Sequence, residues 1–121
     1  MAVSVTNQSN PLGSKLVQDT DCSSTAVDNA TGGTGNLYAV EITNPNGSPV
    51  YFKLADSANA TAGTTAADIV LECPANQTRN IVFVGGIAFT VGFSHWCVTA
   101  AAEASAVAPA SAVTASYVIG A

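Results

Sequence analysis

The chain has 121 residues, which is the length of one domain with a core of its own. Hydrophobic residues make up 48% of the sequence, and this excludes an intrinsically disordered chain. With three cations and a net charge of −5, the chain lacks the basic stripe that nucleic acids and anionic membranes require. Neither is therefore an expected partner.

The low charge content points to a surface made of small neutral side chains. Only 9% of the residues are charged, against about 25% in a typical soluble domain. Such a surface has little electrostatic repulsion to keep copies apart, which suits a protein that packs against neighbouring subunits. An ordinary monomer with a neutral surface is the alternative interpretation.

The three cysteines, Cys22, Cys73 and Cys97, are odd in number and no two have C-x-x-C spacing. We therefore expect buried free thiols in a reducing compartment, with one bridge plus one free thiol as the alternative. The first ten residues have neither the basic nor the apolar part of a secretory signal, and no apolar run approaches the roughly 20 residues of a membrane span. We expect synthesis in a cytosol.

The first 35 residues read as a polar leader that ends in the flexible stretch TGGTG. The sequence predicts an extended N-terminal arm over 1–35 and a separate domain over 36–121. A leader of this kind docks on its own domain or on a neighbour, and partial disorder is the alternative. The predicted subunit-interface residues are its main apolar side chains: Val3, Val5, Leu12, Leu16 and Val17.

Alternating apolar and polar residues predict two strands at 36–44 and 50–54. Between them lies a run of turn formers that contains Asn46-Gly47, the dipeptide most typical of tight hairpins. We therefore expect these two strands to pair as an antiparallel hairpin.

The remainder of the chain has the same character. Gly85-Gly86 is expected to end one strand, Gly92 to bend another, and 99–111 to form a loop. Short strands separated by turn signals, without a long amphipathic helix, predict an all-β antiparallel sandwich of jelly-roll type. The further predicted strands are 68–73, 79–84, 87–91, 93–99 and 112–119.

The sequence offers little for catalysis or metal binding. The one histidine, His95, has Cys97 on the same strand face, but no further ligand motif accompanies the pair, and the preferred interpretation is a wall residue beside Trp96. Asp19 and Asp21 begin a calcium-loop pattern that lacks its required Gly and Glu. We predict no enzyme activity, no cofactor and no metal, with a small hydrolase built on His95 or paired carboxylates as the least favoured alternative.

Four segments occur in an order that resembles a known group of proteins: LYAVEITN, VYFKLAD, AGTTAADIVLECPAN and FVGGIAFTVGFSHWCVTA. Together with the last strand they cover 36–119, and they resemble small β-sandwich virion structural proteins of tailed bacteriophages. That group includes capsid decoration or cement proteins and modules of head or tail fibres. The resemblance implies a non-enzymatic virion protein, made in the host cytoplasm, that forms homotrimers and packs against the major capsid protein or other virion proteins.

A fibre-associated module that binds a host-surface glycan is the alternative function. Sugar-binding modules use exposed aromatic platforms. Exposure of Trp96 or Tyr51 would favour this alternative, and full burial of Trp96 would weaken it.

Overall fold

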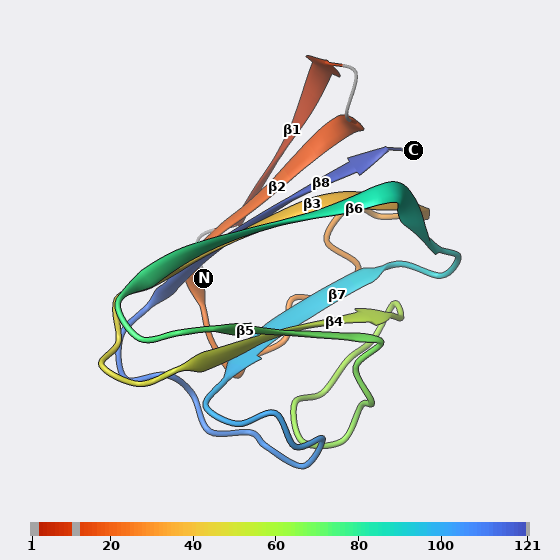
Figure 1. Cartoon of the computed structure of the whole chain (residues 1–121). Coiled ribbons are helices and arrows are strands. Elements are labelled where there is room, and N and C mark those ends of the chain that lie inside the picture. The colour runs from red at the N-terminus through yellow and green to blue at the C-terminus, as the bar shows by residue number, and fades with distance from the viewer. Residues whose placement is uncertain (1–2, 11–12, 121) are drawn as a thin grey trace.

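A computed structural model describes residues 3–10 and 13–120, and the backbone over these residues forms two antiparallel sheets (Figure 1). The five-stranded sheet has the order β1-β2-β8-β3-β6, and the three-stranded sheet has the order β5-β4-β7. The predicted all-β antiparallel sandwich is thereby confirmed, while its jelly-roll type stays a prediction. The strands are β1 (Val3–Asn10), β2 (Gly13–Cys22), β3 (Gly35–Asn44), β4 (Val50–Asp56), β5 (Ile69–Cys73), β6 (Gln77–Phe89), β7 (Phe93–Val98) and β8 (Val113–Gly120).

The main core lies between the two sheets because each strand turns alternate side chains inward. On β8 the buried residues alternate strictly with more exposed ones, as the sequence pattern predicts. The described part of the chain contains no helix long and apolar enough to cross a membrane. The largest members of the core are Leu37, Ile42, Phe52, Leu54, Phe89, Phe93, Tyr117 and Ile119.

The three-stranded sheet is also covered on its outer side, by loops of the same chain (Figure 1). Every residue of β7 is buried, and its Trp96 and Val98 pack with Ala55 and Ala60 in a second, smaller core. Lys53 is buried on this side, and its Nζ donates to the carbonyl of Ala102 at 2.7 Å. The loops over 57–68 and 99–112 thus seal one outer face of the sandwich.

The first 22 residues differ from the expected separate arm. They contain β1 and β2, and β2 pairs along β8, so they build part of the five-stranded sheet. Val17 and Asp19 point into the sandwich and are buried. The sequence did not indicate β2 because a strand with one solvated polar face and few apolar residues has the same composition as a polar leader. Its pairing partner, β8, also lies about one hundred residues further along the chain.

The turn at 44–49 connects the two sheets, and the predicted hairpin between β3 and β4 is wrong. β3 pairs with β6 and β8, whereas β4 pairs with β5 and β7. Gly47 is not among the positive-φ glycines, although the tight Asn-Gly turn needs positive φ at both central residues. Instead, the buried Asn44 Nδ2 donates to the carbonyls of Ser48, Cys73 and Pro74, at 3.0, 3.2 and 3.1 Å.

Gly85 and Gly86 lie inside β6, where a strand end was predicted. Both have positive φ, +83° and +78°, and they lie where the pairing of β3 with β6 shifts register. A Cβ on Gly86 would approach Tyr38 Cε1 to 2.8 Å. The two glycines therefore form an irregularity that carries one long strand past the Tyr38 ring.

The variant Asn44→Ala tests the role of this amide in joining the sheets. It leaves three carbonyl groups and the amide groups of Asn46 without their partner, so we expect the free energy of unfolding to fall by about 2–3 kcal/mol in denaturant titrations. Asn80→Ala, which removes an exposed amide on β6, is the matched control and is expected to change it by less than about 0.5 kcal/mol. Equal effects of the two variants would contradict this account.

Asp56, at the end of β4, closes the connection between β6 and β7. Its carboxylate accepts the backbone N–H groups of Thr90, Val91 and Gly92 at 2.9, 2.7 and 3.2 Å, and the Thr90 hydroxyl at 3.2 Å. Partial burial opposes ionisation, but the hydrogen bonds to Thr90, Val91 and Gly92 outweigh it and lower the pKa of Asp56.

This depressed pKa predicts a pH-dependent contribution to stability. A carboxyl group with a lower pKa in the folded state than in the unfolded state, about 3.9, stabilises the fold above that unfolded value. The contribution is lost as the pH falls through the folded pKa. We expect wild type to exceed Asp56→Asn in stability near neutral pH and the difference to shrink in acid, as measured by urea unfolding across pH. Glu41→Gln controls for net charge, and a pH-independent difference would refute the linkage.

Candidate functional site

The outer face of the five-stranded sheet has no cover from the described part of the chain, and it is the largest regular surface of the fold. Residues that pair directly across neighbouring strands turn their side chains to the same face. The pairing registers therefore place the outward side chains in rows that cross the sheet. We call this surface the outer face.

An apolar row crosses four of the five strands of the outer face, and Thr6 continues it on β1. Val82 on β6 is 65% exposed, and Val84, the next outward residue of that strand, is 97% exposed. Exposed valines are isolated on most surfaces, but Val82 here is the last member of a row of residues that runs across the sheet, and Val84 lies next to it. The row consists of Thr6, Leu16, Val118, Ala39 and Val82.

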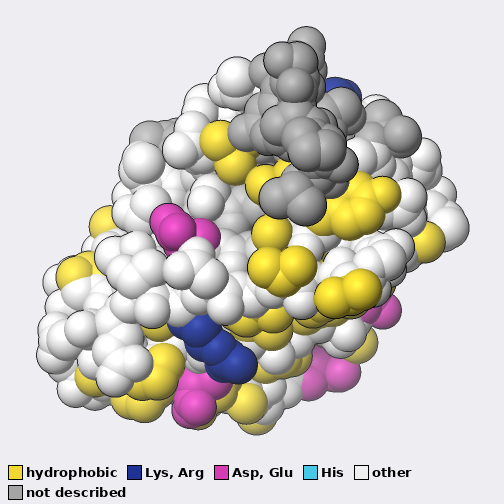
Figure 2. All heavy atoms as spheres, turned by 45° about the horizontal axis from the view of Figure 1, so that its top comes forward, with side chains coloured by type: hydrophobic (Ala, Val, Ile, Leu, Met, Phe, Trp, Pro, Cys, Tyr) yellow, Lys and Arg dark blue, Asp and Glu magenta, His cyan; other side chains and the backbone are white. Residues whose placement is uncertain are grey.

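Neutral polar rows lie beside the apolar one. Thr43 and Thr78 hydrogen bond through their hydroxyls at 3.1 Å on one side of the sheet. Glu41 is the only charged side chain in the polar row nearest to the apolar one, which consists of Ser4, Gln18, Ser116, Glu41 and Asn80. A shallow depression of about 240 Å³ lies between these two rows, over β8, β3 and β6. Figure 2 tilts this face toward the viewer and shows hydrophobic side chains gathered near the middle of the visible surface.

The predicted subunit-interface residues have different positions. Val17 is fully buried in the core, and Val3 packs against that core, so both contribute to this chain's own packing. Val5 is 42% exposed, and Leu16 belongs to the apolar row of the outer face. Leu12 lies outside the described residues. The prediction of an interface itself stays a prediction.

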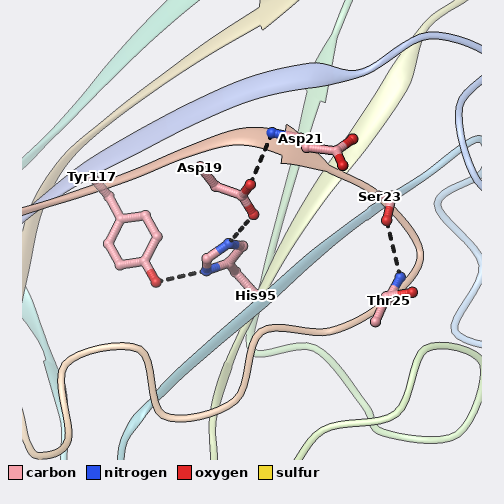
Figure 3. Close-up of polar contacts among 6 residues, drawn as sticks. All are labelled: Asp19, Asp21, Ser23, Thr25, His95 and Tyr117. Atoms are coloured by element: carbon pink, nitrogen blue, oxygen red, sulfur yellow. Dashed lines mark hydrogen bonds and ion pairs between the residues drawn. The ribbon is translucent and has the colours of Figure 1, made fainter. Parts of the chain in front are cut away.

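His95 lies in the core, between the two sheets. Its Nε2 contacts Asp19 Oδ2 at 2.8 Å, and its Nδ1 contacts the Tyr117 hydroxyl at 2.7 Å (Figure 3). The second carboxylate oxygen of Asp19 accepts the N–H of Asp21 at 3.0 Å. His95 is fully buried, and its two partners come from strands distant in the sequence, which no local pattern predicts.

Cysteine side chains border this cluster. All three cysteines are free and buried, which confirms the prediction of buried free thiols. A hydrogen bond with Cys97, together with burial, raises the pKa of Cys22 well above its usual value, and burial raises the pKa of Tyr117 above its ordinary range. Both groups are therefore neutral near pH 7, in a cluster that is closed to solvent. The arrangement does not offer a nucleophile to an external substrate.

The aromatic side chains are mostly used for packing. Trp96 is 1% exposed and lies under the loops that cover the three-stranded sheet, so it offers no platform for a sugar. Tyr51 is half-buried and donates its hydroxyl hydrogen bond to Glu72 Oε2 at 2.8 Å.

Tyr117→Phe tests the energetic importance of the buried cluster. The variant keeps the ring in the core but removes the hydroxyl partner of His95 Nδ1, so we expect a loss of about 1–3 kcal/mol in the free energy of unfolding. Tyr51→Phe removes a hydroxyl bonded at the surface and is expected to cost less than about 0.5 kcal/mol. Thermal and denaturant unfolding measure both. Comparable losses of free energy of unfolding in the two variants would show that the buried cluster stabilises the fold no more than a surface hydrogen bond does.

Comparison with family models, with curated proteins and with solved structures finds no significant match to this chain. The functional conclusion therefore depends on the residues and the geometry described above.

Proposed function

We propose that the chain is a non-enzymatic structural protein of a bacteriophage virion, a capsid decoration or cement protein that packs against capsid subunits. The observation that carries the proposal is the outer face of the five-stranded sheet, which is uncovered by the described part of the chain, partly apolar and nearly free of charge. The resemblance of residues 36–119 to small virion proteins suggests that the partner of this face is another protein of a virion.

The chemistry of the outer face favours a protein partner. Packing against another surface removes the apolar row, together with the neighbouring Val84, from water, which is favourable in proportion to the apolar area. Of the two central rows, only Glu41 brings a charge that must be desolvated. Neutral hydroxyl and amide groups in the neighbouring row can hydrogen bond across the contact.

The two outer faces of the sandwich differ in a way that supports the same conclusion. The loops over 57–68 and 99–112 cover the three-stranded sheet and bury Trp96 beneath them. No part of the chain over 3–10 and 13–120 covers the five-stranded sheet in this way, although its central row is mostly apolar. A sheet face of this composition is typical of an interaction surface.

Decoration of a capsid also depends on repetition. We propose that the chain acts as a homotrimer, so that several weak contacts with neighbouring capsid subunits bind together and stabilise the assembled shell. The outermost strand, β1, with the exposed Val5, is a suitable edge for contact between copies. A glycan-binding fibre module has less support because Trp96 is buried.

The experiment compares two valines of equal exposure on opposite sides of the sandwich. Val82 lies on the outer face and is 65% exposed, whereas Val107 lies in the loop over the three-stranded sheet and is 64% exposed. Val82→Asp places a charge in the contact, so we expect at least about a tenfold loss of affinity for undecorated capsids of the same phage. Val107→Asp is expected to bind within about twofold of wild type.

Co-sedimentation with capsid shells measures the affinity, and the melting temperature of the shells measures the stabilisation. Light scattering of the free protein gives the oligomeric state, for which we expect a trimer. A wild-type protein that is monomeric and binds no capsid lattice would overturn the proposal. Equal loss in both aspartate variants would show that the outer face is not the contact.

A further inference from the structure

The buried cluster around His95 brings together several side chains that can bind a metal ion. Asp19, Cys22 and His95 each place one potential ligand atom within 4.8 Å of the others, and all three residues are at most 1% exposed. Cys97 is the neighbour that contributes most to the raised pKa of Cys22, so the two cysteines lie near each other. A carboxylate, an imidazole and a thiol thus share one site inside an otherwise apolar core, and a second thiol lies nearby.

We propose that Asp19, Cys22 and His95 bind a structural zinc ion between the two sheets, and that Cys97, which lies outside this group of three, moves in as the fourth ligand. Thiolate, imidazole and carboxylate are the ligands of four-coordinate structural zinc. Each cysteine that coordinates zinc releases its thiol proton to solvent. Zinc binding therefore replaces thiol protons by the ion, and no atom changes its oxidation state. The ion would join β2 of one sheet to β7 of the other.

The distances fit with small adjustments. Zinc lies about 2.0 Å from nitrogen or oxygen and about 2.3 Å from sulfur, so neighbouring ligand atoms in a tetrahedral site are about 3.3–3.8 Å apart. The 4.8 Å spread of the three ligand atoms contracts to this range with side-chain shifts of about one ångström. The 2.8 Å contact of His95 Nε2 with Asp19 Oδ2 opens by about half an ångström.

The backbone of β2 is shaped so that both of its ligands face inward. In a regular strand, residues three apart such as Asp19 and Cys22 point to opposite faces. Here the register shifts between them, because Asp19 pairs with Ala115 and Cys22 with Val113. Three steps along β2 thus correspond to two steps along β8, and this irregularity turns both side chains into the core.

The groups around the ligands support the assignment independently. A zinc-bound histidine normally donates its other ring N–H to an oxygen, and His95 Nδ1 contacts the Tyr117 hydroxyl at 2.7 Å. A zinc-bound carboxylate is normally hydrogen bonded through its free oxygen, and Asp19 Oδ1 accepts the N–H of Asp21. Both ligands are therefore held in an orientation suited to an ion (Figure 3).

The thiols give a further reason. A thiol is a weak hydrogen-bonding group, so Cys22 and Cys97 gain little from each other or from polar neighbours. Coordination to zinc is the strongest interaction available to two adjacent thiols in a reducing compartment. Cys73, which is also buried, instead contacts the carbonyls of Ile42 and Gln77 and provides a matched control.

The test uses the whole chain, purified under a phosphine reductant without chelator. We expect the protein to retain one zinc ion per chain by mass spectrometry of the metal content. After removal of zinc by chelator, addition of Co²⁺ is expected to give the thiolate-to-cobalt charge-transfer band and the intense visible absorption of a tetrahedral site. Zinc is expected to raise the melting temperature of the metal-free protein.

Variants identify the ligands. Cys22→Ser and Asp19→Asn are expected to weaken zinc binding more than about 100-fold, whereas Cys73→Ser is expected to bind as wild type does. If Cys22→Ser fails to fold, Asp19→Asn and the wild-type cobalt spectrum still decide the question. Absence of the cobalt–thiolate band in the wild type, or its survival in Cys22→Ser, would overturn the proposal. So would a Cys22–Cys97 disulfide that persists under the reductant.

Discussion

His95 connects the two sheets, and the arrangement of the core depends on its two contacts. It lies on β7 of the three-stranded sheet, while Asp19 and Tyr117 lie on β2 and β8 of the five-stranded sheet. Hydrogen bonds require particular distances and directions, whereas apolar contacts tolerate sliding. Two such contacts on one imidazole ring therefore define how far the sheets are offset. The apolar side chains around them, such as Phe52, then pack within that frame.

The inner and outer faces of the five-stranded sheet serve different purposes in the two proposals. Asp19 points toward the proposed zinc ion and Tyr117 toward its ligand His95, whereas their neighbours Gln18, Ser116 and Val118 point to the proposed capsid contact. A metal ion beneath β2 would hold the strand that carries part of the outer face. A surface that is already rigid loses less entropy on binding, so the proposed zinc site would favour the proposed assembly role.

The sequence predicted most strands closely, and the errors have physical causes. The alternation in β3 and β8 places the strand bounds within one residue of those observed. The turn at 44–49 was misread because Asn-Gly favours a hairpin, but the buried Asn44 amide organises a crossing between sheets. A pair of glycines often ends a strand, and the sequence therefore predicts a strand end at Gly85 and Gly86. Glycine also marks irregularities within strands, and that is its role here.

The sequence by itself determined the all-β class, the buried free thiols and the nearly uncharged surface, because these depend on residue types and local alternation. Tertiary structure alone decided which strands pair, that β1 and β2 join the sheet, and that the polar cluster exists. Asp19 and His95 are 76 residues apart, and the irregularity in β2 reverses the direction expected for one of its side chains. Contacts at such separations depend on how the whole sandwich closes, and no local pattern encodes that closure.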